Sequence, residues 1–228
     1  LLNPDTVVEP DTFDVMLDFM DAQQEAGAAT CRIDLASGGL DWASHRGFPT
    51  PWSAFAYMAG LEALFPKSRL FGGYHMRWLD LRTMHESDCR TGAFFLVRRE
   101  VFEAVGGLDP DYFMYGDDLD WALRIKRLGW RIYYHPATRI VHYKGVSTGL
   151  KAFSRRWSHA DTTQRLRRNR DFFHAMRVFY DKHYGPADRP LLRAAVHAAI
   201  VAAREARALR YRAEAAIGAV RARLSGAP

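Results

Sequence analysis

The chain has 228 residues, of which 48% are hydrophobic, so it can bury one sizeable core in one or two domains. Its two cysteines, Cys31 and Cys89, exclude a disulfide-stapled fold, have no metal-pair spacing, and favour a reducing compartment. Residues 1–150 contain 15 Lys and Arg against 20 Asp and Glu, whereas residues 151–228 contain 17 against 6. A tail this basic indicates a nucleic acid, an anionic membrane surface or a phosphorylated substrate as its partner.

The chain opens with two apolar residues, Leu1 and Leu2, followed by the polar turn Asn3-Pro4-Asp5. This pattern is typical of the end of a buried strand, so we expect earlier strands of the same domain to precede residue 1. Segment 11–24 has apolar residues at helical spacing after a capping Asp or Thr, and it predicts a helix packed on a sheet. The following segments predict a loop over 36–51, a short helix over 53–64 and an irregular segment over 66–90.

The middle of the chain has a clearer pattern. A continuous apolar run over 93–97 predicts a buried strand, and 100–105 predicts a short helix ended by two glycines. A stronger helix is predicted over 118–128, with an apolar face and a stop at Gly129. Two strands are then expected, over 131–134 and 139–143.

After residue 150 the pattern becomes helical and basic. One helix is predicted over 152–183 and a second, rich in Ala and Arg, over 191–224. No apolar run reaches the ~20 residues of a membrane-spanning helix, since Arg193 and His197 interrupt the best candidate. We therefore expect an α/β domain over 1–150 and a basic helical extension over 151–228.

Four short motifs occur in order along the α/β domain. They are Leu2-Asn3-Pro4-Asp5, then Thr91-Gly92-Ala93 with Arg98-Arg99, then the run Gly107 to Asp120 with its Tyr115-Gly116-Asp117-Asp118, and finally His142-Tyr143-Lys144-Gly145-Val146-Ser147. In this order the motifs resemble those of the inverting, metal-dependent family 2 glycosyltransferases with a GT-A fold, especially bacterial rhamnosyltransferases that act on polyprenyl-diphosphate-linked sugars. The resemblance extends from the first residue to about Gly185.

The resemblance implies a metal-assisted transfer from a nucleotide-sugar donor. Breaking the bond between the anomeric carbon and a diphosphate develops negative charge, which a divalent cation can neutralise. As in the family, Asp5 and His142 would be the protein ligands of Mg²⁺ or Mn²⁺, and the diphosphate would complete the shell. Many relatives have a further carboxylate where this chain has Asn3, so the metal would depend strongly on the nucleotide.

The resemblance also assigns the residues that handle the acceptor. Asp118 would take the proton from the attacking hydroxyl, and Asp117 would orient the acceptor or tune its neighbour. Adjacent carboxylates at a helix start can have their pKa values pushed apart, which suits a base near neutral pH. Asp120 is expected to be structural. The substrate would be bound by Asn3, Arg90, Thr91 and Gly92.

Each motif also has a simpler explanation. Asp117 and Asp118 could cap a helix and complement its dipole. His142 could be a hydrogen-bonded core residue, and Asn3-Pro4-Asp5 could be only a turn. Arg90, Arg98 and Arg99 could form a solvated face. The ordered set, rather than any single motif, favours the active-site interpretation.

The basic extension has three interpretations. Its helices could be a solvated pair that covers the α/β domain. Alternatively, arginines of the first helix could face lipid phosphates or the acceptor's diphosphate while Leu191–Ala203 lies in the membrane interface. These arginines are Arg155, Arg156, Arg165, Arg167, Arg168 and Arg170. A nucleic-acid partner is disfavoured, because no zinc spacing, RNA-binding motif or helix-turn-helix signal accompanies the charge.

Together, the residues and the resemblance predict an inverting transfer of a hexose, L-rhamnose from dTDP-rhamnose, onto a lipid-linked cell-envelope glycan. The protein would be cytoplasmic and peripheral on the inner face of the cell membrane. Transfer of another sugar, such as galactofuranose, is the alternative within the enzyme class. The alternative outside that class is a non-catalytic remnant that binds a membrane or a partner through its basic helices.

Overall fold

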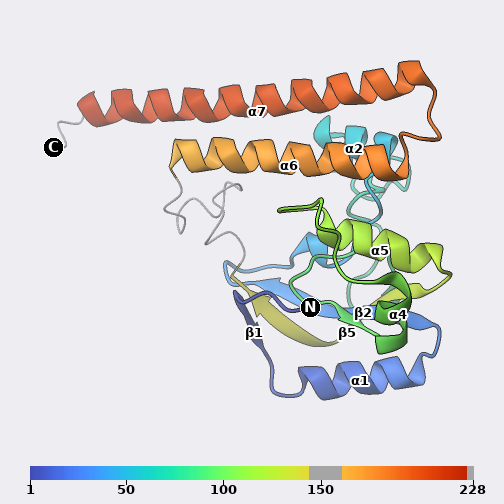
Figure 1. Cartoon of the computed structure of the whole chain (residues 1–228). Helices are drawn as coiled ribbons and strands as arrows, with labels where there is room; N and C mark the ends of the chain where they lie inside the picture. Colours follow the sequence, from blue (N-terminus) through green and yellow to red (C-terminus); the bar gives the residue numbers. More distant parts are fainter. Residues whose placement is uncertain (144–160, 225–228) are drawn as a thin grey trace. The chain divides into compact units, whose positions relative to one another are not determined.

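The structure is a computed structural model that describes residues 1–143 and 161–224, with side chains described as far as residue 218. These residues divide into two compact units (Figure 1). The first comprises residues 1–111 and 116–143, and the second comprises residues 112–115 and 161–224. The boundary expected near residue 150 lies outside the described residues, as do Arg155, Arg156 and the motif residues after Tyr143.

A mixed β-sheet forms the centre of the first unit. Strand β2 (Ala26–Leu35) runs parallel to β5 (Arg131–His142), and the other strands pair antiparallel to one of these two. The strand order is β1-β5-β2-β4, with β3 also paired to β5. The three shorter strands are β1 (Thr6–Val8), β3 (His85–Glu86) and β4 (Leu96–Val97). This mixed sheet, with helices on it, confirms the expected α/β class.

Strand β5 is continuous where the sequence predicts two strands. Cys31 and Arg32 are adjacent on β2, yet they pair with His135 and Arg139 of β5. The residues in between bulge out of the ladder and begin with Pro136, which has no N–H to donate. The sequence pattern therefore locates the interruption correctly, but β5 pairs with the same neighbour on both sides of it.

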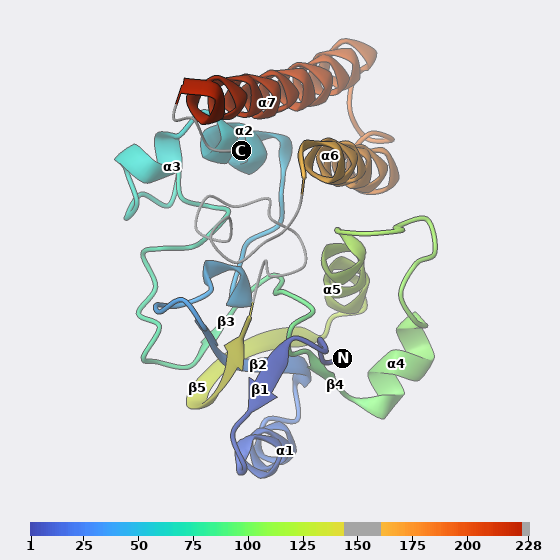
Figure 2. The same cartoon turned by 90° about the vertical axis from the view of Figure 1, so that its left-hand side faces the viewer.

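Helices cover both faces of this sheet (Figure 2). On one face, α1 (Thr12–Ala22) confirms the helix predicted over 11–24. On the other face lie α4 (Arg99–Val105) and α5 (Asp117–Arg127), close to the bounds predicted for both. Successive buried residues of β2 point to opposite faces, as in any strand, so Ala29 packs with α1 and Ala28 packs with α5.

Two apolar clusters result, one on each side of the sheet. The α1 side buries Met16, Phe19, Met20, Ile33, Phe94 and Ile140. The α4 and α5 side buries Phe95, Val101, Trp121, Ala122, Ile125 and Ile132. The sequence predicts a strand over 93–97, but only Leu96–Val97 forms one, while Phe94 makes an isolated bridge to Leu2.

The segment between β2 and β3 contains short elements. A 3₁₀ turn, η1 (Trp42–Ser44), interrupts the loop predicted over 36–51. The helix predicted over 53–64 is two helices, α2 (Pro51–Met58) and α3 (Leu61–Leu64), because Gly60 between them has φ +79. Within the segment predicted to be irregular, 66–90, the structure assigns only β3.

The second unit is a helical hairpin. Its helices are α6 (Thr162–His183) and α7 (Pro190–Leu224), which agree with the two predicted helices over the residues described. Tyr211 of α7 is buried, and the Arg165 guanidinium lies 4.1 Å from the centre of its ring while pairing with Glu214 at 2.9 Å. Among the residues described, neither helix is both long enough and apolar enough to cross a membrane.

Asp120 has the structural role expected from its sequence position. Its carboxylate is 1% exposed and accepts a 2.7 Å hydrogen bond from the Nε of Arg124 one turn later in α5. The other guanidinium nitrogens of Arg124 donate to the backbone oxygens of Val105 and Gly107, each at 2.8 Å. The Asp120–Arg124 pair therefore links the C-terminal end of α4 to α5.

We predict that Asp120→Asn destabilises the protein by about 2–4 kcal/mol, because it leaves the Arg124 charge without its buried partner. Urea unfolding followed by circular dichroism measures this. The matched control is Asp80→Asn, which breaks the exposed pair of Asp80 with Arg82 and should change the midpoint little. Equal effects from the two substitutions would contradict the structural role of Asp120.

Candidate active site

The carboxylate of Asp118 is held at the start of α5 by two donors from distant segments. Its Oδ2 accepts hydrogen bonds from the Arg46 guanidinium and from the backbone N–H of Gly92, both at 3.1 Å. A Cβ added at Gly92 would lie 4.0 Å from the Cβ of Asp118 and 4.0 Å from the Oδ1 of Asn3. Three of the residues predicted for the site, Asn3, Gly92 and Asp118, therefore lie together.

Arg46 was not identified from the sequence, yet it organises this cluster. Its guanidinium donates to the Tyr74 hydroxyl and to the Arg90 carbonyl oxygen, both at 3.1 Å, in addition to Asp118. Its backbone is fixed by a β-bridge to Cys89. Burial raises the pKa of Tyr74, so this phenol stays neutral and can accept the hydrogen bond from Arg46. Asp118 therefore lies opposite a fixed, nearly buried cation.

Asp117 has a different environment from its neighbour. Burial first, and then the negative charge of Asp118, raise the pKa of the Asp117 carboxyl above its ordinary value. The side chains share the N-terminus of α5, where the positive end of the helix dipole favours carboxylates. The carboxylate of Asp118 is thus compensated by Arg46, whereas ionisation of Asp117 is disfavoured. Two neighbouring carboxyl groups with such different environments are typical of acid–base sites.

His142 and Asp5 form a second cluster at the end of β5. The Nε2 of His142 lies 3.3 Å from Oδ1 of Asp5, and its Nδ1 lies 3.4 Å from Oδ2 of Asp41. The side chains of His142 and Asp41 are 4% and 2% exposed. Asp41 also caps η1 by accepting from the Ala43 N–H at 3.0 Å, which fixes the position of its carboxylate.

These contacts orient the imidazole of His142. With Nδ1 facing Asp41, the Nε2 atom is directed at Asp5, as in the carboxylate–histidine pairs that support metal ions. No three His, Cys, Asp or Glu side chains in residues 1–143 and 161–224 are arranged to hold a metal ion by themselves. Asp5 and His142 offer one carboxylate oxygen and one imidazole nitrogen, donor types that a divalent cation can take as ligands. Asp41 was missed because an Asp before a short turn reads as an ordinary cap.

Arg90 and Thr91 precede Gly92, and both make contacts within the protein. The Arg90 side chain is fully buried, donates to the Tyr133 carbonyl oxygen and to the Ser87 hydroxyl, and contacts the Phe95 ring. Burial lowers its pKa to about 9. Thr91 donates its N–H to the Ala43 carbonyl at 2.8 Å. The Arg90 side chain therefore supports strand β5, and its carbonyl oxygen supports Arg46. The two terminal guanidinium nitrogens of Arg90 both donate to protein groups.

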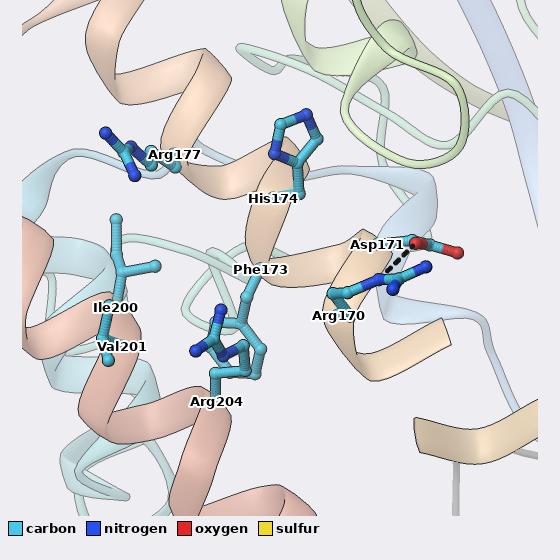
Figure 3. Close-up of a pocket in the computed structure, with 8 residues that line it drawn as sticks. All are labelled: Arg170, Asp171, Phe173, His174, Arg177, Ile200, Val201 and Arg204. Atoms are coloured by element: carbon cyan, nitrogen blue, oxygen red, sulfur yellow. Dashed lines mark ion pairs between the residues drawn. The ribbon is translucent and has the colours of Figure 1, made fainter. Parts of the chain in front are cut away.

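The second unit carries a separate basic hollow between α6 and α7 (Figure 3). Its volume is about 330 Å³. Phe173, Ile200 and Val201 supply apolar lining, and Arg170, Arg177 and Arg204 supply positive charge. Of the arginines predicted to face phosphates, Arg167 and Arg170 are exposed, whereas Arg165 turns toward α7.

Known proteins match this chain over most of its length. The sequence model described as "Glycosyltransferase like family 2" matches residues 1–170. Rhamnosyltransferase WbbL of Escherichia coli (strain K12) is 30% identical over 190 residues, which are 78% of this chain and 67% of that protein.

Two other relatives are similar. The N-acetylglucosaminyl-diphospho-decaprenol L-rhamnosyltransferase of Mycobacterium tuberculosis (strain ATCC 25618 / H37Rv) is 31% identical over 178 residues, 71% of this chain and 52% of that protein. The O-antigen biosynthesis protein RfbC of Myxococcus xanthus is 29% identical over 153 residues, 64% of this chain and 11% of that protein. The chain thus spans about two thirds of the first relative's length and about half of the second's.

We predict that Asp117→Asn raises the melting temperature at pH 7. A carboxyl whose pKa is raised in the folded state destabilises the fold when it ionises, so removing its charge stabilises the fold above the folded pKa. The gain should vanish as the pH falls toward the ordinary value of 3.8. Thermal unfolding at pH 7 and near pH 4 measures the difference, with the exposed Asp18→Asn as a control. A lower melting temperature at pH 7 would show that the Asp117 charge instead stabilises α5.

Proposed function

The chain belongs to glycosyltransferase family 2, and we propose that it transfers L-rhamnose from dTDP-rhamnose, with inversion, to a lipid-linked cell-envelope glycan. The observation that carries this proposal is the Asp118 carboxylate, fixed by Arg46 and Gly92 beside Asn3. Two rhamnosyltransferases among the relatives support the choice of sugar, and the printed name of one describes a decaprenol-linked acceptor. Activity, substrates and partners of the whole protein are part of this proposal.

In the proposed reaction Asp118 acts as the general base. The acceptor hydroxyl attacks the anomeric carbon from the face opposite the diphosphate, and a carboxylate oxygen of Asp118 takes its proton. The sugar–phosphate bond breaks as the new glycosidic bond forms, and the nucleoside diphosphate leaves with the bonding electrons. A fixed carboxylate favours this step because the proton acceptor is already placed before the acceptor binds.

The neighbouring residues would bind and orient the substrates. Asp117 would position the acceptor hydroxyl or tune the basicity of Asp118. Asn3 and Gly92 would border the reacting sugar. Thr91 and Arg90 would take part in substrate binding by holding the segments that carry Gly92 and Arg46.

A divalent cation, Mg²⁺ or Mn²⁺, would be held by Asp5 and His142, with Asp41 orienting the histidine. When bound, it would neutralise the charge that develops on the leaving diphosphate. The hard carboxylate oxygen of Asp5 and the imidazole of His142 suit such an ion.

We further propose a cytoplasmic site of action on the inner face of the cell membrane, because a polyprenyl-linked acceptor is embedded in a bilayer. The basic α6 and α7 would contribute to this peripheral attachment through lipid phosphates. A different sugar, such as galactofuranose, remains the second candidate substrate. The third candidate is a non-catalytic remnant, for which the encoded protein would show no transfer at all.

We predict that Asp118→Asn reduces the transfer rate at least about 100-fold, since the amide cannot accept the proton. The transfer rate of the complete encoded protein is measured with radiolabelled dTDP-rhamnose and a lipid-linked N-acetylglucosamine acceptor. The matched control is Asp14→Asn on the exposed side of α1, which should keep the parent rate. Retention of most of the rate by a folded Asp118→Asn protein would exclude Asp118 as the base.

We also predict that removing divalent metal with EDTA abolishes transfer and that Mn²⁺ or Mg²⁺ restores it. His142→Ala should raise the Mn²⁺ concentration needed for half-maximal rate by about tenfold or more. His174→Ala, in the second unit, serves as the control. Full activity after exhaustive chelation would contradict the metal assignment.

A further inference from the structure

An exposed apolar surface of the first unit lies on α2, α3 and the segment that follows them. Its residues, called the aromatic surface below, are the exposed Trp52, Phe55, Leu64, Phe65 and Leu70 together with the half-buried Phe71, whose ring contacts Trp52 and Phe65. Leu64 is 71% exposed, Leu70 is 61%, and Phe55 is 54%. Single exposed apolar residues are ordinary, but a contiguous group of this size indicates an interaction site.

The rings of the aromatic surface contact one another. Trp52 lies 5.8 Å from Phe55 and 6.1 Å from Phe71 between ring centres, and Phe71 lies 5.3 Å from Phe65. The indole Nε1 of Trp52 donates to the Leu70 carbonyl oxygen at 2.8 Å. Because this donor is already satisfied, the indole can enter an apolar phase without losing a hydrogen bond to water.

The charge around the aromatic surface is positive. Residues 50–72 contain Lys67 and Arg69 as their basic residues, both exposed, and neither pairs with a carboxylate in the described part of the chain. Their one acidic residue, Glu62, is 3% exposed and is bound by His75 at 3.0 Å. Aromatic rings flanked by unpaired basic side chains match the boundary between acyl chains and anionic headgroups.

The aromatic surface is also joined to the proposed catalytic carboxylate. Tyr57 of α2 packs against Tyr74 with ring centres 5.1 Å apart. The Tyr74 hydroxyl accepts from Arg46, which in turn holds Asp118. Three successive side-chain contacts thus connect α2 to Asp118, all within one compact unit.

We propose that the aromatic surface docks the protein on an anionic lipid bilayer and so presents Asp118 to acceptors embedded there. The presentation of Asp118 to acceptors rests on the proposed function, but the docking itself requires no donor sugar. A second copy of the chain is the competing occupant. The bilayer is favoured because two copies would bring Lys67 and Arg69 of both chains together without exposed carboxylates from the same segment to balance them.

Vesicle binding tests the docking directly. Co-sedimentation with vesicles of phosphatidylglycerol and phosphatidylcholine should show at least tenfold weaker binding for Phe55→Ser/Leu64→Ser, since both apolar side chains that would enter the bilayer are removed. Lys67→Glu/Arg69→Glu should weaken binding only when phosphatidylglycerol is present. The control Leu17→Ser/Leu128→Ser removes two comparably exposed residues elsewhere on the unit and should bind as the parent does. Unchanged circular dichroism and melting temperature confirm that each variant is folded.

Fluorescence locates the contact. Lipids with brominated acyl chains should quench the parent's tryptophan emission, and Trp52→Phe should remove the quenched component while keeping an apolar ring. Parent-like vesicle binding by Phe55→Ser/Leu64→Ser, or emission from Trp52 that is not quenched, would overturn the proposal. A parent dimer that this double variant converts to a monomer, with vesicle binding unchanged, would assign the aromatic surface to a second copy.

Transfer assays separate this proposal from the proposed function. With a short-chain, water-soluble acceptor the Phe55→Ser/Leu64→Ser protein should keep the parent rate, whereas transfer to a vesicle-embedded acceptor should fall with binding. If the parent transfers no sugar to either acceptor but binds vesicles through these residues, the proposed function fails while the docking stands. Loss of transfer to the soluble acceptor in the folded variant would contradict a docking role.

Discussion

The ion pair between Arg46 and Asp118 is the interaction on which the arrangement of the site depends. It joins residues 72 positions apart, linking the loop after β2 to the first turn of α5. The two side chains are 11% and 15% exposed, so each would be an uncompensated, poorly solvated charge without the other. The N–H of Gly92 adds a third segment to the same oxygen. One carboxylate thus fixes the relative positions of three parts of the chain and is itself fixed by them.

The candidate site contains two charged clusters with different chemistry. At α5, a carboxylate compensated by Arg46 stands beside Asp117, whose ionisation is disfavoured by burial and by its neighbour. At the end of β5, Asp41 and Asp5 lie on opposite nitrogens of the His142 ring. The proposed mechanism uses the first arrangement for proton transfer from the acceptor and the second for a cation that binds the diphosphate. Gly92, close to both Asn3 and Asp118, lies where the Asn3-Pro4-Asp5 turn meets the α5 cluster.

The local sequence pattern was sufficient to predict α1, α4, α5 and α7. Apolar spacing and glycine stops are properties of each segment by itself, so no contact with a distant segment is needed to recognise them. The local pattern was insufficient where strand pairing between distant segments decides the extent of an element. The two strands predicted in place of β5 form one strand, because both pair with β2 on either side of a bulge. The same limit applies to Arg46, which lies in an aperiodic loop and acts through a contact far along the chain. Arg90 shows a different limit. Arginines are seldom fully buried, so the burial of its side chain could be seen only once Tyr133 and Ser87 were placed around it.

The two proposals together describe an enzyme that works at the membrane–water boundary on acceptors that stay in the bilayer. Its central chemical claim is a single displacement with one base. The most direct measurement is the anomeric configuration of the transferred sugar, read from its one-bond C1–H1 coupling in NMR spectra of the product. A single displacement at Asp118 predicts the configuration opposite to that of the donor. Retention of the donor's configuration would require a covalent or front-face mechanism and would contradict the role given to Asp118.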